Sequence, residues 1–315
     1  MRCNLQRRQP SPGAIPFHMT TRPCKTSISI DTSRGETLQG MHISGRYRCG
    51  AQQRNSSLEK DGLDVVLSSG FLAFGSHCGF LQAIVDSKIK VRGIMGTSSG
   101  ALTGALFATQ KFTISEIAAE LRKPPIESIK LSGTPWKGLF SLDPATQRLR
   151  ELLPADFADL DLEFSCGVAG PDGRYECMNS GRLPEAVVAS AAVPILFTPV
   201  KIPGRGNQPH IDGGVVTRVG LDLWREQQMK KYGFDDDSPP PAMVHIVGRS
   251  SPFSGSDTVS EGNSKDAFFV FSPKSRASLF QLKEFDFQFQ SAYASTMHTI
   301  EKEFSVRTEN KSLIL

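Results

Sequence analysis

The stretch Gly96-Thr97-Ser98-Ser99-Gly100 decides the fold of this chain. The apolar residues 91–95 precede it, and the small residues 101–108 follow it. An apolar strand, a Gly-x-Ser-x-Gly turn and a helix in this order are the context in which the motif forms a nucleophile elbow. Gly96 and Gly100 are needed because a Cβ at either position would collide with the neighbouring strand or helix. We therefore expect the Ser98 hydroxyl to stand clear of the backbone, with a purely structural tight turn as the alternative.

Elements of alternating type surround this turn. Residues 63–68 are rich in β-branched side chains and predict a strand, and residues 75–86 predict a helix that leads back into the strand before the turn. Strand, helix, strand and helix in succession imply a parallel pair with a right-handed crossover and a sheet covered on both faces. The sequence therefore predicts an α/β fold with three layers, α/β/α, around a mostly parallel central sheet.

Further elements follow along the chain. Residues 113–123 predict an amphipathic helix that opens with the capping-box pattern Thr113-Ile114-Ser115-Glu116. We expect two strands within 157–180 around a turn at 170–173, a short helix over 183–190, a linker at 235–241, a buried strand over 242–247, a mobile loop over 251–265, and a helix over 279–304. The alternation of Phe at 285, 287 and 289 leaves a strand as the alternative for part of that last segment.

The charge of the chain is unevenly spread. The chain has 315 residues and a formal net charge of +4. Residues 1–60 hold ten Lys and Arg against three Asp and Glu, whereas residues 61–315 hold 26 against 29. Because the second part is mildly acidic, we expect it to bind no nucleic acid.

Residues 1–60 are rich in Arg and Ser, poor in acidic residues, and without an apolar run of signal-peptide length. This composition is typical of an organelle transit peptide. We expect a disordered N-terminal extension over 1–60 that directs the protein to the plastid, and a folded domain over 61–315. The alternatives are a mitochondrial address, or a tail without an address in a cytoplasmic protein. No stretch of the chain approaches the length of a membrane span.

The cysteines do not indicate a metal site. Outside the N-terminal extension the chain has Cys78, Cys166 and Cys177, which lack metal-ligand spacing, and we expect neither a metal nor another cofactor. Cys166 and Cys177 lie on either side of the predicted turn. A two-residue loop would place them opposite each other, and a three-residue loop with a left-handed Gly173 would offset them by one position. Free buried thiols are expected, with a redox pair as the alternative.

A candidate base for the serine lies in His210-Ile211-Asp212-Gly213-Gly214. An apolar strand that ends in Asp-Gly-Gly places a carboxylate at its tip, and Gly213 and Gly214 let another backbone approach closely. A buried carboxylate can act as a general base when desolvation raises its pKa toward the working pH. Taken alone, the motif is equally compatible with an ordinary Asp-Gly turn.

Three motifs in fixed order together resemble the patatin-like phospholipase family. They are Gly-x-Ser-x-Gly at 96–100, the Ala-Ser-x-x-x-Pro-x-x-Phe-x-Pro segment within 187–200, and Asp-Gly-Gly at 212–214. The resemblance covers about residues 63–221 and implies a patatin-like acyl hydrolase domain. It further implies a lipid acyl hydrolase in which Ser98 is the nucleophile, Asp212 is the general base, and an acyl-enzyme forms. Residues 189–199 would wall the acyl pocket, with Pro194, Leu196 and Phe197 as its expected lining.

The loop after the first strand departs from the family. Relatives carry Gly-Gly-Gly-x-Arg-Gly, whereas this chain has Ser69-Gly70-Phe71-Leu72-Ala73-Phe74. Backbone N–H groups stabilise an oxyanion whatever the side chains are, so Gly70, Phe71 and Ser99 are the expected donors. The lost glycines and arginine predict a changed substrate preference or a weaker activity. We expect a membrane lipid as the substrate, and Phe71, Leu72 and Phe74 or the Phe-rich C-terminal segment as a peripheral membrane contact.

Two other functions remain as alternatives. An α/β-hydrolase esterase with a Ser-Asp-His triad would need one of the three histidines that follow the elbow, which are His210, His245 and His298. A patatin-like protein that binds lipid without turning it over would explain the altered loop. His77 is expected to be a hydrogen-bonding structural residue at the start of a helix. The sequence does not indicate an oligomeric state.

Overall fold

The computed structural model describes residues 62–206, 208–233, 239–250 and 254–305. The predicted transit peptide over 1–60 and most of the linker at 235–241 lie outside the described residues and stay predictions. Within the described part, no helix combines the length and the apolar character that crossing a bilayer requires.

An eight-stranded sheet forms the middle layer. Its strands are β1 (Leu63–Leu67), β2 (Val91–Thr97), β5 (Glu163–Ala169), β6 (Tyr175–Met178), β7 (Val200–Lys201), β8 (Pro209–Asp212), β9 (Ala242–Val247) and β10 (Ala267–Ser272). The order is β10-β9-β1-β2-β5-β8-β7, and β6 pairs with β5 beside that path. The five strands from β10 to β5 are parallel, whereas β6, β8 and β7 add an antiparallel edge. The predicted mostly parallel sheet is confirmed.

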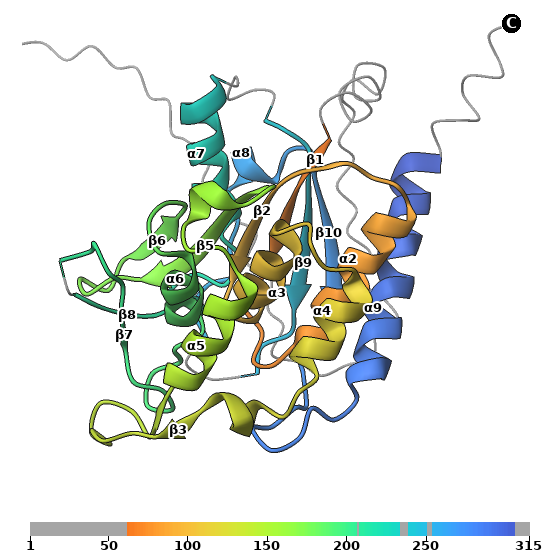
Figure 1. The fold of residues 1–315 in the computed structure, drawn as a ribbon. Helices are drawn as coiled ribbons and strands as arrows, with labels where there is room; N and C mark the ends of the chain where they lie inside the picture. Colours follow the sequence, from red (N-terminus) through yellow and green to blue (C-terminus); the bar gives the residue numbers. More distant parts are fainter. Residues whose placement is uncertain (1–61, 207, 234–238, 251–253, 306–315) are drawn as a thin grey trace, which may run out of the picture.

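Helices cover both faces of this sheet. The helices are α2 (Phe74–Asp86), α3 (Ser99–Ala108), α4 (Ile114–Leu121), α5 (Asp143–Leu152), α6 (Leu183–Ser190), α7 (Leu221–Tyr232), α8 (Glu261–Ser264) and α9 (Phe285–Ile300), with short helical turns η1 (Pro125–Ser128), η2 (Phe157–Asp159), η3 (Gly213–Val215) and η4 (Glu301–Ser305). In Figure 1, α2 and α9 lie side by side on one flank, and α7 lies at the other.

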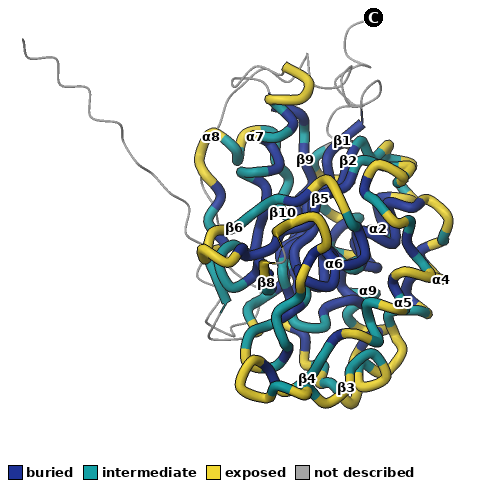
Figure 2. The backbone as a smooth tube through the Cα atoms, turned by 60° about the vertical axis from the view of Figure 1, so that its left-hand side comes forward, coloured by how far each residue is buried: buried dark blue, intermediate teal, exposed yellow. Residues whose placement is uncertain are grey.

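The strand alternation explains the two apolar layers. Leu63, Val65 and Leu67 of β1 pack into the larger core with α2, α3, α4, α6 and α9. Val66 points to the opposite face and packs with Trp224 of α7 in the smaller core. Because successive side chains of a strand point to opposite faces, one buried strand supplies both cores. The predicted three-layer α/β/α architecture is confirmed, and Figure 2 shows the buried strands at its centre.

Local predictions on α4 and on the β5–β6 hairpin hold. The side chain of Thr113 accepts from the Glu116 N–H and the Glu116 carboxylate accepts from the Thr113 N–H, which is the expected capping box of α4. In the β5–β6 hairpin Gly173 is left-handed at φ 77° and Cys177 pairs with Gly167, so Cys166 and Cys177 are offset by one position. Both thiols are free.

Two predictions on the second half need correction. Residues 285–300 form helix α9, so the strand alternative for the Phe alternation is wrong. The expected mobile loop over 251–265 is wrong in its described part, because Asp257 is buried in an ion pair with Arg218 and residues 261–264 form α8. The sequence reading missed α5, α7 and β10, and also a small antiparallel hairpin of β3 (Lys130–Leu131) and β4 (Phe140–Ser141).

Candidate active site

Ser98 lies at the junction of β2 and α3 with φ 57° and ψ −120°, a backbone conformation that residues other than glycine rarely adopt. The two flanking glycines allow the close packing around it: a Cβ on Gly96 would run into the carbonyl of Gly100, and a Cβ on Gly100 into that of Leu67. Gly104 of α3 likewise packs against Ile94 of β2. The small residues after the elbow therefore let α3 sit directly on the sheet.

Strand register brings Asp212 to Ser98 although 114 positions separate them in the sequence. Thr97 pairs with Gly167 across β2 and β5, and Val168 pairs with Asp212 across β5 and β8. The Ser98 side chain lies near enough to the Asp212 carboxylate to lower its pKa, and Asp212 Oδ1 accepts from the Gly214 N–H at 2.7 Å. Gly213 packs against the backbone of Gly167, which leaves no room for a Cβ.

Burial sets the protonation of Asp212. The residue is 2% exposed, and desolvation raises its pKa to about 7. The Ser98 side chain, the hydrogen bond from Gly214 and the charge of Arg218 act in the opposite direction, but they do not cancel the effect of burial. A carboxylate with a pKa near neutrality can both accept and return a proton, which is the property that a general base needs.

Ser190, at the end of α6, hydrogen bonds to the backbone of the elbow. Its hydroxyl accepts from the Ser98 N–H at 2.9 Å and donates to the Gly167 carbonyl at 2.6 Å. The sequence analysis placed this residue only in the pocket wall. The Ala-Ser pair at the end of a small-residue helix was the available signal for it.

The loop of residues 69–73 lies beside the elbow. The Gly70 carbonyl accepts from the Ser99 hydroxyl at 2.5 Å and from the Ala73 N–H at 3.1 Å, and Leu72 is held at φ 52°. Among the described residues, the backbone N–H groups of Phe71 and Ser99 have no acceptor, and both residues line the cavity in front of Ser98. Gly70 is buried, and its N–H likewise has no acceptor among the described residues.

Arg218 is a buried anchor of the same loop that the sequence analysis missed. Its side chain is 1% exposed, and it donates to the Ser69 carbonyl at 2.7 Å, to the Val247 carbonyl, and to Asp257 at 2.6 Å. Nothing in the local sequence distinguishes it from a surface arginine. Only the tertiary structure shows that it fixes the start of the loop.

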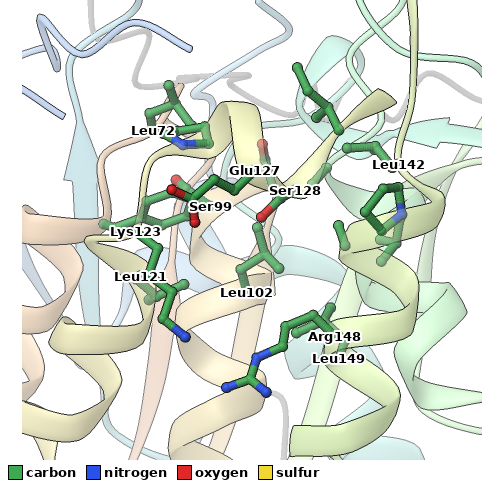
Figure 3. A pocket seen from close by; sticks show the side chains of 18 of the residues that line it. Leu72, Ser99, Leu102, Leu121, Lys123, Glu127, Ser128, Leu142, Arg148 and Leu149 are labelled. Carbon is green, nitrogen blue, oxygen red and sulfur yellow. The ribbon is translucent and has the colours of Figure 1, made fainter. Parts of the chain in front are cut away.

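A cavity of about 450 Å³ opens at Ser98. Its wall is mostly apolar and comes from α3, α4, α5 and α6, and it includes Leu102, Leu106, Leu121, Leu142, Leu149, Leu152 and Val188 (Figure 3). Glu120, Lys123 and Arg148 also line it, and both cations pair with Glu120, at 2.6 Å and 2.8 Å. The cavity thus combines a lipid-like interior with a charged group.

Pro194, Leu196 and Phe197 are the residues expected to line the acyl pocket. Phe197 lines the cavity, whereas Pro194 and Leu196 do not. The reason is backbone pairing: the Leu196 carbonyl accepts from the Phe140 N–H of β4, and this segment runs along the hairpin rather than into the cavity. Phe71, Leu72 and Phe74 all line the cavity, and Phe74 is only 7% exposed, so it presents little surface to a membrane.

No histidine in the described part of the chain hydrogen bonds to Ser98 or Asp212. His210 bonds to the Gln208 carbonyl at 3.1 Å, and His245 bonds to His77 and Ser272, each at 2.9 Å. No described histidine is therefore placed to act as the base of a Ser-Asp-His triad with Ser98. Among the described residues, no three His, Cys, Asp or Glu side chains cluster in a way that could hold a metal ion.

The chain is similar in fold to VipD from Legionella pneumophila (13% identity, TM-score 0.47, covering 77% of this chain and 67% of that one). It is also similar to the type III effector protein ExoU (12% identity, TM-score 0.39, covering 77% of this chain), of which it spans about half the length, 53%. The family model described as patatin-like phospholipase matches residues 65–223, which contain Ser98, Asp212 and all three motifs. Since that match covers half of the chain, the protein belongs to the patatin-like phospholipase family.

Proposed function

We propose that this protein hydrolyses an acyl ester of a membrane phospholipid or another glycerolipid with Ser98 and Asp212 as a catalytic dyad. One observation carries the proposal: a serine on a strained elbow faces a buried carboxylate whose pKa burial raises to about 7, at the mouth of an apolar cavity. Membership in the family supports lipid acyl hydrolysis in general.

The first half of the reaction makes an acyl-enzyme. Asp212 takes the proton of the Ser98 hydroxyl as the oxygen attacks the ester carbonyl, and a tetrahedral oxyanion forms. The oxyanion collapses, the bond to the leaving alcohol breaks, and Asp212 returns the proton to that alcohol. In the second half Asp212 takes a proton from water, the hydroxide attacks the acyl-enzyme, and Ser98 regains its proton as the fatty acid leaves.

The oxyanion needs donors that are in place before the reaction. The Phe71 and Ser99 N–H groups line the cavity beside Ser98, and the Ser99 N–H also lies in the first turn of α3. The first turn of a helix has N–H groups without intrahelical acceptors and carries partial positive charge. These two groups are our proposed oxyanion hole. Gly70 directly precedes Phe71 in the same loop.

The cavity favours a long acyl chain. Its volume is within the usual range for a site that encloses a small molecule, and its leucine-rich wall contains few groups that could bind a polar substrate. The acyl chain would lie between α3 and α5, since Leu102 and Leu149 line that space in Figure 3.

An exposed apolar surface beside the cavity suggests how the lipid is reached. We define the hairpin surface as Leu131, Trp136, Leu139 and Ile195, which are 80%, 78%, 50% and 68% exposed. The Leu139 N–H donates to the Ile195 carbonyl at 3.1 Å, so the two segments are joined. Ser128 and Ile129 line the cavity just before β3, and Phe197 lines it just after Ile195. The surface is therefore continuous with the cavity, and we propose that it inserts into a lipid bilayer.

Active-site labelling tests the hydrolase directly. A fluorophosphonate probe should label the wild-type protein covalently, and Ser98→Ala should abolish labelling and release of fatty acid from mixed membrane lipids. Thr296→Val is the matched control, because it removes a buried hydroxyl in α9, whose Oγ1 bonds only the Ala292 carbonyl at 2.6 Å, far from the site in sequence and fold. A folded wild-type protein that neither labels nor hydrolyses any lipid would support the lipid-binding alternative instead.

A further inference from the structure

Two buried histidines that the proposed mechanism does not use lie behind the elbow. His77 of α2 and His245 of β9 face each other with their Nδ1 atoms 2.9 Å apart, and both side chains are fully buried. Phe80 stacks on the His245 ring with the centroids 4.7 Å apart. Buried polar rings are retained only when their nitrogens are satisfied, so the partners at each end show what the pair does.

The pair is the middle of a hydrogen-bonded chain that ends at the loop of residues 69–73. His77 Nε2 lies 3.2 Å from Ser99 Oγ, and Ser99 Oγ lies 2.5 Å from the Gly70 carbonyl oxygen. At the other end His245 Nε2 lies 2.9 Å from Ser272 Oγ of β10. Four bonds thus link an outer strand of the sheet to the peptide that follows Gly70.

The carbonyl at the end fixes the direction of every bond. A carbonyl only accepts, so the Ser99 hydroxyl donates to it and must accept from His77 Nε2–H. His77 Nδ1 then carries no proton and accepts from His245 Nδ1–H. His245 Nε2 accepts in turn from the Ser272 hydroxyl. Burial lowers the pKa of His77 to about 3 and that of His245 well below its usual value, so both rings are neutral and one proton lies between them.

The hydrogen-bonded chain acts on the oxyanion hole through one peptide unit, the one between Gly70 and Phe71. The Gly70–Phe71 bond is trans, so the Gly70 C=O and the Phe71 N–H point in opposite directions. Holding the carbonyl toward Ser99 Oγ therefore turns the Phe71 N–H away from it. Arg218 holds the preceding carbonyl, that of Ser69, at 2.7 Å.

We propose that the chain His245–His77–Ser99 positions the Phe71 N–H as an oxyanion donor. The proposal rests on the proposed function, and the histidines are positioning residues that touch no substrate. It also explains how a loop without the family's glycines and arginine keeps one conformation. Leu72 at φ 52° is strained, and a strained loop persists only when its surroundings fix it.

The first test measures proton positions and needs no activity. In the folded Ser98→Ala protein, long-range ¹H–¹⁵N spectra of ¹⁵N-histidine should show His77 as the Nε2–H tautomer and His245 as the Nδ1–H tautomer. The resonances are assigned with His77→Gln and His245→Gln. The opposite tautomers would reverse the direction of the hydrogen bonds through the two histidines. The Gly70 carbonyl would then lose its donor, and the proposal would be overturned.

The second test separates positioning from binding. Ser99→Ala removes the last link and should lower kcat by about 10- to 100-fold, less than the loss expected for deleting an oxyanion donor outright. KM should change by no more than about twofold, because the cavity wall stays intact. Affinity for a trifluoromethyl ketone, which forms an anionic adduct on Ser98, should fall by the same factor as kcat/KM.

Substitutions of His77 complete the comparison. His77→Gln keeps one donor and one acceptor and should retain most of kcat, whereas His77→Leu should lose as much as Ser99→Ala. Thr296→Val is the control for loss of a buried hydroxyl. An unchanged kcat in Ser99→Ala, or a loss confined to KM, would refute the positioning role. If Ser98→Ala still hydrolysed lipid, the proposed function would fail instead, while the tautomer measurement would still stand on its own.

Discussion

At the scale of single residues, the raised pKa of Asp212 has opposite consequences for catalysis and for stability as pH rises. A base must be ionised to accept the Ser98 proton, yet burial disfavours its ionised form and raises its pKa to about 7. The carboxylate is therefore largely protonated below pH 6 and ionised above pH 8. We expect kcat/KM to rise with pH through about 7, and this acid limb is measured with a neutral ester substrate.

The same pKa predicts a stability effect of opposite sign. Since the pKa of Asp212 is raised from 3.8 to about 7 on folding, the unfolded chain releases this proton first, and stability falls as pH rises between those values. Asp212→Asn removes the charge, retains an oxygen for the Gly214 N–H, and should abolish hydrolysis. The free energy of unfolding of the variant minus that of the wild type should be roughly 2–4 kcal/mol larger at pH 8 than at pH 5, because only the wild type loses stability as Asp212 ionises. Urea titrations at both pH values measure this, and a pH-independent difference would contradict the raised pKa.

Arg218 is the residue whose loss should most disturb the fold near the site. Replacing it with Met leaves the Asp257 carboxylate buried with Arg249 as its remaining cation, and frees two carbonyls that it satisfies. Removing one partner of a buried pair typically costs about 3–5 kcal/mol. Chemical denaturation should show a loss of that size for Arg218→Met and a smaller one for the double variant Arg218→Met/Asp257→Leu. Equal losses in both variants would mean that the ion pair is not the cause.

Single residues also show what sequence could and could not predict at the site. Ser98 and Asp212 stand in motifs whose glycines are required by close backbone approach, so their positions followed from local sequence. Ser190 and Arg218 could not be found in this way, because their roles depend on which carbonyls the tertiary structure brings within reach. Local sequence also could not show that Pro194 and Leu196 lie outside the cavity, because that depends on the backbone pairing of their segment with β4.

At the scale of elements, the gap between α3 and α5 sets the depth of the cavity. Leu102 lies on α3 in the cavity wall, three residues and almost one turn past Ser99. Leu102→Trp should fill part of the volume and lower kcat/KM for long-chain esters by at least about tenfold relative to a butyrate ester. The butyrate ester is the internal control, because its chain is too short to reach the added ring. An unchanged chain-length profile would place the acyl chain elsewhere.

The elements that sequence predicted are those with a strong local signal. The strand 63–67, the elbow and the capped helix 114–121 have apolar periodicity and clear end signals. Helix α7 was missed because it carries five charged residues among twelve and buries only part of one face, which consists of Leu221, Trp224, Arg225 and Gln228. Strand β10 was missed because only its pairing with β9 shows that its Phe-rich run is an edge strand.

At the scale of the whole molecule, the parallel half of the sheet was predictable and the antiparallel edge was not. Successive strand and helix signals fix the order of β1 and β2, because parallel neighbours need a crossover helix. The strands β8 and β7 are short and polar, and their place depends on the pairing of β8 with β5 and of β7 with β8. It is nevertheless this edge that delivers Asp212 to Ser98, so the site's completion is a property of the assembled sheet.

The orientation of the molecule on a membrane is the prediction that belongs to this scale. The β3–β4 hairpin lies at one end of the molecule (Figure 2), and its Leu131 and Trp136 are 80% and 78% exposed. Lys130 and Lys137 are their neighbours in sequence, and Ser128 and Ile129 line the cavity just before β3. Tryptophan is favoured at the boundary between lipid headgroups and acyl chains. Leu131→Ser/Trp136→Ser should reduce co-sedimentation with phospholipid vesicles by about tenfold or more, because each side chain loses apolar area that would leave water.

Activity toward a dispersed butyrate ester should be unchanged in this double variant, since neither residue lines the cavity. Phe287→Ser is the matched comparison, because Phe287 is 68% exposed on α9 and represents the Phe-rich C-terminal segment as a competing contact. A loss of vesicle binding in Phe287→Ser alone would move the membrane contact to α9. In that orientation a lipid would have to leave the bilayer fully before reaching Ser98, whereas contact through the hairpin surface lets an acyl chain pass from the membrane into the cavity without crossing water.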